Sequence, residues 1–210
     1  FPGDERARFE RDVLYPLAGL DPSSAERYDR ALQILHRLDY AGNEAARRYL
    51  DGRIDADKII LVGHSFGATA VAAALGEGAR VLGGVLLDPA GIGRELPQLL
   101  RRISVPMMVI GADEDIWPTR NRGQFYRFIP RAVGEISIRD TVHQDAQYPN
   151  EHTLRAFEDQ PDDTEEAQIA FVSALTASAF GLAATASIDY GWDSFEQAIK
   201  NGTFFNARRK

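Results

Sequence analysis

The stretch Lys58–Leu75, KIILVGHSFGATAVAAAL, decides the fold. Its first five residues are an apolar run that predicts a buried strand, and residues 68–75 are small helix formers that predict a helix. The pentapeptide GHSFG lies between them, with glycine at positions 63 and 67. Because glycine has no Cβ, we expect both positions to let the incoming strand and the outgoing helix approach closely.

A strand, a G-x-S-x-G pentapeptide and a helix in this order are typical of a nucleophile elbow. In such a turn the serine has a strained backbone and its hydroxyl lies above the sheet. Ser65 is therefore the predicted nucleophile. The backbone N–H of Phe66 would begin the helix, where partial positive charge favours a developing oxyanion, so Phe66 is the predicted oxyanion donor.

Composition excludes several classes of protein. The chain has 210 residues, 44% of them hydrophobic, which fits one domain over residues 1–210. The formal charge is −7 and no long basic block occurs, so no nucleic-acid partner is expected. The absence of cysteine excludes disulfides and thiolate nucleophiles. No apolar run approaches the ~18 residues of a membrane span, so we expect a soluble protein without an integral membrane segment. Cytoplasmic location and secretion after processing both fit.

Strand and helix patterns alternate along the rest of the chain. Apolar runs predict further strands at 81–87, 105–111 and 134–139, and helical patterns cover 94–102, 120–128 and 164–186. One short helix is expected in the tail from 192 to 210. This alternation predicts an α/β fold with a mostly parallel sheet flanked by helices on both faces. Ligands bind beyond the carboxyl ends of such strands, so candidate site residues should follow the strands directly.

Two further kinds of chemical group occupy such positions. His143 follows the strand at 134–139 and is the predicted general base for Ser65. A carboxylate must then orient His143, and two strand ends offer one. Asp88 follows the strand at 81–87, and Glu114, with Asp115 beside it, follows the strand at 105–111. The residues alone leave Asp88 and the alternative acids Glu114 and Asp115 open.

The chain resembles the serine α/β-hydrolases, whose catalytic groups follow the same order of nucleophile, acid and histidine. Residues 63–67, then Leu87-Asp88, then Val142-His143-Gln144 resemble the platelet-activating-factor acetylhydrolases and their bacterial relatives. The segment 87–91, LDPAG, also resembles the acid-bearing segment of pancreatic-type lipases. Both resemblances imply that Asp88 is the acid of the triad, so we favour Asp88 and keep Glu114 and Asp115 as the alternative acid. They cover about residues 25–150.

The first 57 residues depart from this pattern. Nothing there resembles the H-G-x-G oxyanion loop of such hydrolases, and no strongly apolar strand precedes residue 59. We therefore expect the chain to be the later part of a hydrolase domain, without its N-terminal strands. A second oxyanion donor is not identified.

These features favour a serine esterase or lipase that acts through an acyl-enzyme on a small-molecule or lipid ester. Trp117 and Phe66 are candidate walls of the substrate pocket. No cofactor and no metal ion are expected, because no ligand pattern for one occurs. An acyltransferase or thioesterase on the same triad is the first alternative. A non-catalytic, hydrolase-like binding module is the second, suggested by the missing front strands.

Overall fold

The computed structural model describes residues 58–91, 94–113, 122–146, 164–185 and 189–210. These residues build one five-stranded sheet with the order β1-β2-β3-β4-β5. The first four strands are parallel, and β5 pairs with β4 in the antiparallel direction. The strands are β1 (Ile60–His64), β2 (Gly83–Leu87), β3 (Met107–Gly111), β4 (Ala132–Ile138) and β5 (Phe204–Arg209).

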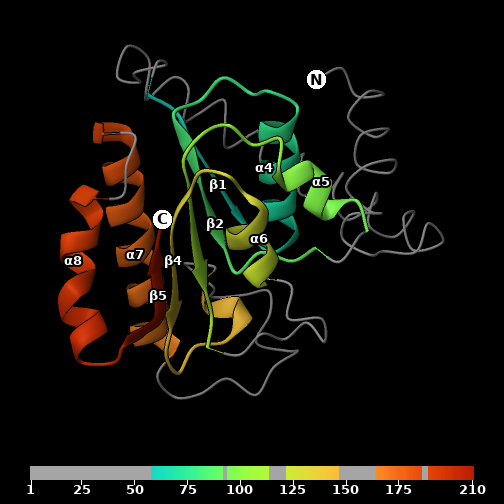
Figure 1. Cartoon of the computed structure of the whole chain (residues 1–210). Coiled ribbons are helices and arrows are strands. Elements are labelled where there is room, and N and C mark those ends of the chain that lie inside the picture. The colour runs from blue at the N-terminus through green and yellow to red at the C-terminus, as the bar shows by residue number, and fades with distance from the viewer. Residues whose placement is uncertain (1–57, 92–93, 114–121, 147–163, 186–188) are drawn as a thin grey trace, which may run out of the picture.

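Helices cover both faces of this sheet, as Figure 1 shows. On one face lie α4 (Phe66–Gly76), α5 (Leu96–Leu100) and α6 (Arg122–Phe128), and on the other lie α7 (Thr164–Thr185) and α8 (Asp189–Lys200). A short 3₁₀ helix, η3 (His143–Ala146), follows β4. The predicted α/β fold with a mostly parallel sheet is confirmed.

Two apolar cores explain why the central strands are buried. Every residue of β2 and β3 is buried, because successive side chains point to opposite faces and each face meets helices. Leu86 and Val109 join the core beneath α4, α5 and α6, whereas Val85 and Ile110 join the core beneath α7 and α8. A fully buried side chain of this size stabilises the fold by about 1.5–3 kcal/mol, so these two strands anchor the sheet.

The prediction of a buried first strand is only partly correct. Ile59 is 40% exposed and Val62 is 43% exposed. Among the described residues β1 pairs with β2 alone, so it forms the edge of the described sheet. An apolar run indicates that a strand forms, but it does not indicate whether the strand lies at the centre or the edge of the sheet. The expectation of missing N-terminal strands concerns residues 1–57, which lie outside the described residues.

The tail contains more structure than predicted. In place of one short helix it forms the 12-residue α8 and then the strand β5. Arg208 and Arg209 obscure the strand pattern, because charged residues are depleted from typical strands. In the folded protein the Arg208 guanidinium pairs with Glu135 of β4 and Arg209 pairs with Asp189 of α8. These partners lie far away in sequence, so the local pattern does not reveal them.

Helix α7 is the one helix in the described ranges that is long and apolar enough to cross a membrane, judged by length and composition only. Of its residues 166–184, 39% are buried within the protein. Phe171, Ala174 and Leu182 pack in the second core, against the sheet. On this side of the helix, the apolar side chains therefore pack in the core.

Candidate active site

The backbone of Ser65 is strained. Ser65 lies between β1 and α4 with φ 54° and ψ −121°, a backbone conformation that residues other than glycine rarely adopt. A residue in such a conformation raises the free energy of the folded state by about 1–3 kcal/mol, and the conformation persists only where the surrounding structure holds it. Here the Ser65 N–H donates to the carbonyl of Leu87 at 3.0 Å, and the Ser65 carbonyl accepts from Ala68 and Ala90 at 3.1 and 3.2 Å.

The Ser65 hydroxyl is not used to cap the helix that it precedes. Serine at an N-cap position commonly accepts a hydrogen bond from the first turn of the helix. Ser65 occupies this position before α4 but makes no such bond. Phe66 is the first residue of α4, so its N–H belongs to the positive end of the helix dipole, as predicted. A strained serine beside such a helix end has the arrangement expected of a nucleophile elbow.

Only one of the two elbow glycines is required by packing. A Cβ on Gly63 would lie 2.3 Å from the backbone oxygen of Gly67, so no side chain fits there. A Cβ on Gly67 would meet nothing within 4 Å. The expectation that both glycines permit close approach is thus correct for Gly63 and wrong for Gly67, because position 67 faces outward on α4.

Asp88 follows β2 directly and is held from three sides. Its N–H donates to the carbonyl of Ile110 at 2.6 Å, and its Oδ1 accepts from the N–H of Ala112 at 3.1 Å. Its Oδ2 lies 2.6 Å from Nδ1 of His143. The carboxylate is only 3% exposed, so these bonds replace the water that it has lost. Its φ of 35° is a second strained position at the same end of the sheet.

The loop that follows Asp88 is tied to the serine turn. Ala90 donates its N–H to the carbonyl of Ser65, and its own carbonyl accepts a close hydrogen bond from the buried Thr69 hydroxyl of α4. The turn that carries Ser65 and the loop that carries Asp88 therefore form one hydrogen-bonded unit. Sequence reasoning did not identify Thr69, although a hydroxyl inside an otherwise apolar helix is a usable signal.

His143 begins η3 and is also buried, with 3% of its surface exposed. Its Nδ1 faces Asp88 at 2.6 Å, which fixes the tautomer with the proton on Nδ1 and leaves Nε2 as the acceptor. Within the loop, the N–H of Val142 donates to Oδ2 of Asp145 at 2.8 Å, and the N–H of Asp145 donates to the carbonyl of Val142 at 3.1 Å. The structure thus brings together the predicted acid and the predicted base.

The loop after β4 is also fixed to the loop after β3. The N–H of Asp113 donates to both the carbonyl oxygen and the hydroxyl oxygen of Thr141, each at 3.2 Å. Asp113 Oδ2 in turn accepts from the N–H of Asp140 at 2.9 Å. The first carboxylate after β3 therefore supports the loop that leads to His143. The alternative acids Glu114 and Asp115, and the pocket candidate Trp117, lie outside the described residues.

His64 is the residue whose role sequence reasoning underestimated. It was not among the predicted site residues. In the structure its Nε2 lies 2.8 Å from the backbone oxygen of His143, and the two imidazole centroids are 4.4 Å apart. Burial and the neighbouring His143 ring lower the pKa of His64 to about 4.

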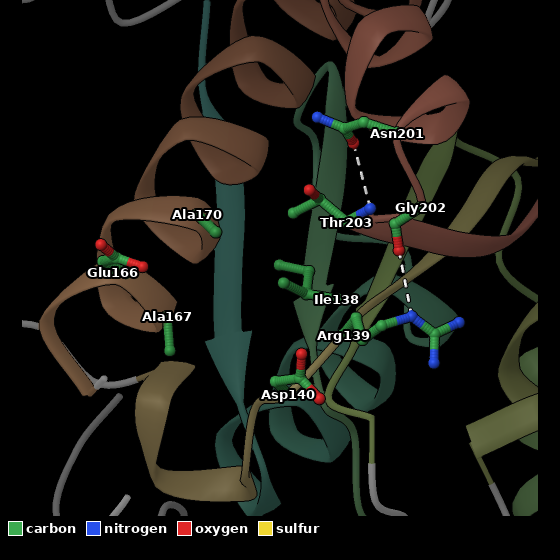
Figure 2. A pocket seen from close by; sticks show the side chains of 9 residues that line it. All are labelled: Ile138, Arg139, Asp140, Glu166, Ala167, Ala170, Asn201, Gly202 and Thr203. Carbon is green, nitrogen blue, oxygen red and sulfur yellow. Dashed lines mark hydrogen bonds between the residues drawn. The ribbon is translucent and has the colours of Figure 1, made fainter. Parts of the chain in front are cut away.

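A polar hollow of about 350 Å³ lies near the end of β4, and Figure 2 shows its lining. Its walls come from the end of β4, the start of α7 and the turn between α8 and β5. Nε of Arg139 donates to the carbonyl of Gly202 at 3.1 Å, and the N–H of Thr203 donates to Oδ1 of Asn201 at 3.1 Å. These polar groups hold the turn, and none of the predicted site residues lines the hollow. Across the described residues no group of three or more His, Asp or Glu side chains could hold a metal ion.

A family model described as "Alpha/beta hydrolase family" matches residues 4–197. The chain belongs to the alpha/beta hydrolase family. This alpha/beta hydrolase is also 34% identical, over 100 residues, to a platelet-activating factor acetylhydrolase from Bos taurus. The match covers 45% of this chain and 21% of that relative, so the chain spans about a fifth of the relative's length.

Proposed function

We propose that this alpha/beta hydrolase is a serine hydrolase that cleaves carboxylic esters, of short-chain acids or of lipid acyl groups, through an acyl-enzyme. The observation that carries the proposal is the buried hydrogen bond from His143 to Asp88, next to a strained serine on a strand–helix turn. Strain and a desolvated carboxylate–imidazole pair raise the energy of the fold, and both features have a function in acyl transfer. The bovine relative is named an acetylhydrolase, which agrees with an ester substrate.

In the proposed first step, His143 Nε2 removes the Ser65 hydroxyl proton while Oγ bonds to the ester carbonyl carbon. The carbonyl oxygen becomes negative and is stabilised by the N–H of Phe66 at the start of α4. Asp88 keeps the His143 ring in place and stabilises its positive charge. His143 then gives the proton to the leaving alkoxide, so the alcohol departs and Ser65 carries the acyl group.

In the second step, water replaces the alcohol. His143 removes a proton from this water, and the resulting hydroxide bonds to the acyl carbon. The bond to Ser65 Oγ breaks, Oγ recovers the proton from His143, and the carboxylic acid leaves. In this scheme His143 carries the proton in both steps, and Asp88 keeps its negative charge throughout.

The test is substitution of Ser65. We expect Ser65→Ala to lower kcat for p-nitrophenyl acetate by roughly 10⁴- to 10⁶-fold, because the acyl-enzyme can no longer form. A fluorophosphonate probe should label the parent protein and leave Ser65→Ala unlabelled. Ser173→Ala, at an exposed position on α7, is the matched control and should behave as the parent. A Ser65→Ala protein with the parent rate would contradict the proposal.

A further inference from the structure

His64 connects two distant parts of the sheet. It is the last residue of β1, whereas His143 follows β4, and two strands separate β1 from β4 in the sheet order. A backbone carbonyl can only accept a hydrogen bond, so Nε2 of His64 must carry the proton that is shared at 2.8 Å. The imidazole planes meet at 42° with their centroids 4.4 Å apart, so the two rings are also in contact.

His143 therefore has two restraints of different kinds. Asp88 holds the ring through Nδ1, and His64 holds the main chain through the carbonyl. A side chain is aimed accurately only when both its rotamer and its backbone are fixed, since either freedom alone moves the outer ring nitrogen. We infer that His64 is a positioning residue of the proposed serine hydrolase, which holds the backbone of His143 so that its ring stays aimed at Ser65. This inference rests on the proposed function.

The charge of His64 suits this role. The titratable groups that face its ring are His143 and Asp88. Because burial and His143 lower the pKa of His64 to about 4, His64 remains neutral near neutral pH. His143 can then accept a proton without facing a second positive imidazole. The proton on Nε2 stays in the hydrogen bond to the carbonyl throughout the reaction, so His64 does not compete for the proton of Ser65.

Two substitutions separate the hydrogen bond from the ring contact. His64→Phe keeps an aromatic ring against His143 but has no donor. His64→Gln loses the ring but places an amide N–H at the same number of bonds from Cβ as Nε2. Lys210→Met is the matched control, because Lys210 also donates to carbonyl oxygens, those of Tyr126 and Ile129, at a different place in the fold.

Two readouts are required. The first is the far-downfield proton resonance of the His143 Nδ1–H bound to Asp88, which reports the geometry of the pair without any substrate. The second is the separation of kcat from KM with p-nitrophenyl acetate. We expect His64→Phe to broaden or abolish the resonance and to lower kcat by about 10- to 100-fold at nearly constant KM, since small misplacements have effects of this size. His64→Gln should restore both to within about threefold, and Lys210→Met should change neither.

The outcomes are decisive in both directions. A resonance that survives unchanged in His64→Phe overturns the inference, whatever happens to kcat. Loss of the resonance in both His64→Phe and His64→Gln also overturns it, because the donor would then not be the cause. If the parent protein neither hydrolyses the ester nor reacts with a fluorophosphonate, the proposed function fails. The resonance in the two variants then still decides whether His64 positions His143.

Discussion

Asp88 and Glu135 are two buried carboxylates with opposite surroundings. Each is 3% exposed, and each pairs with a side chain from a distant part of the sequence. Asp88 lies at the carboxyl end of β2, where its partner His143 is as buried as itself. Glu135 lies within β4, and its partner Arg208 on β5 keeps 55% of its side chain exposed and lies over the Tyr126 ring.

The two pairs place the same chemical group in different physical conditions. The Asp88 pair is desolvated on both sides and built on a strained residue, and both features raise the energy of the fold. The hydrogen bond from the N–H of Ala112 offsets part of this cost. In the Glu135 pair the Arg208 guanidinium stays half exposed to water, so its desolvation penalty is smaller. The pair links the antiparallel strand β5 to β4. Asp88 therefore should matter for activity and Glu135 for stability.

The largest expected effect is on catalysis at Asp88. Asp88→Asn should lower kcat for p-nitrophenyl acetate by about 10³- to 10⁴-fold, because an amide favours the wrong tautomer of His143. The unfolding midpoint in urea should change far less than kcat does. Near-normal turnover in Asp88→Asn, with a large loss in Glu114→Gln, would instead assign the acid to Glu114.

An intermediate effect is expected in acid, at the same end of the sheet. Unfolded His64 binds a proton near its ordinary pKa of 6.5, whereas folded His64 does so only near 4. As the pH falls through this window the unfolded chain binds more protons, so the folded protein loses up to about 3 kcal/mol. Urea titrations between pH 7 and pH 4 should show this loss in the parent and a smaller one in His64→Gln. Equal losses in both proteins would exclude His64 as its source.

The smallest effect is expected at the other carboxylate. Glu135→Gln should lower the free energy of unfolding by about 1–2 kcal/mol, a modest value because Arg208 can turn toward water once its partner is neutral. The folded fraction should keep a kcat close to that of the parent. A double-mutant cycle with Arg208→Gln measures the coupling between the two side chains. A loss of kcat as large as that of Asp88→Asn would remove the distinction between the two carboxylates.

The fold was predictable where local pattern and tertiary environment agree. The strands β2 and β3 are continuous apolar runs because they are buried on both faces, and the helix between them, α5, follows from spacing. Strand β5 was missed because its arginines depend on Glu135 and Asp189, which the local sequence does not place nearby. The exposure of Val62 was missed because strand order is a property of the whole sheet.

The candidate site was predictable to a similar extent. Chain order and strand ends indicated Ser65, Asp88 and His143, and resemblance favoured Asp88 among the acids. The hydrogen bond from His143 to Asp88 agrees with that preference, while the assignment of roles remains a proposal. The bond from His64 to the carbonyl of His143 could not be predicted, since it depends on how the loop after β4 folds back toward β1.

Under the proposed function, the positive φ of Ser65 sets folding and reactivity against each other at a single position. Glycine adopts φ 54° with little strain, so a chain optimised for thermal resistance alone would replace the serine with glycine. Engineering of a heat-tolerant variant by selection for folding alone would thus tend to eliminate the hydroxyl. Under the proposed function such a selection needs a simultaneous screen for turnover, because the variant with the least strain at this residue has lost its nucleophile.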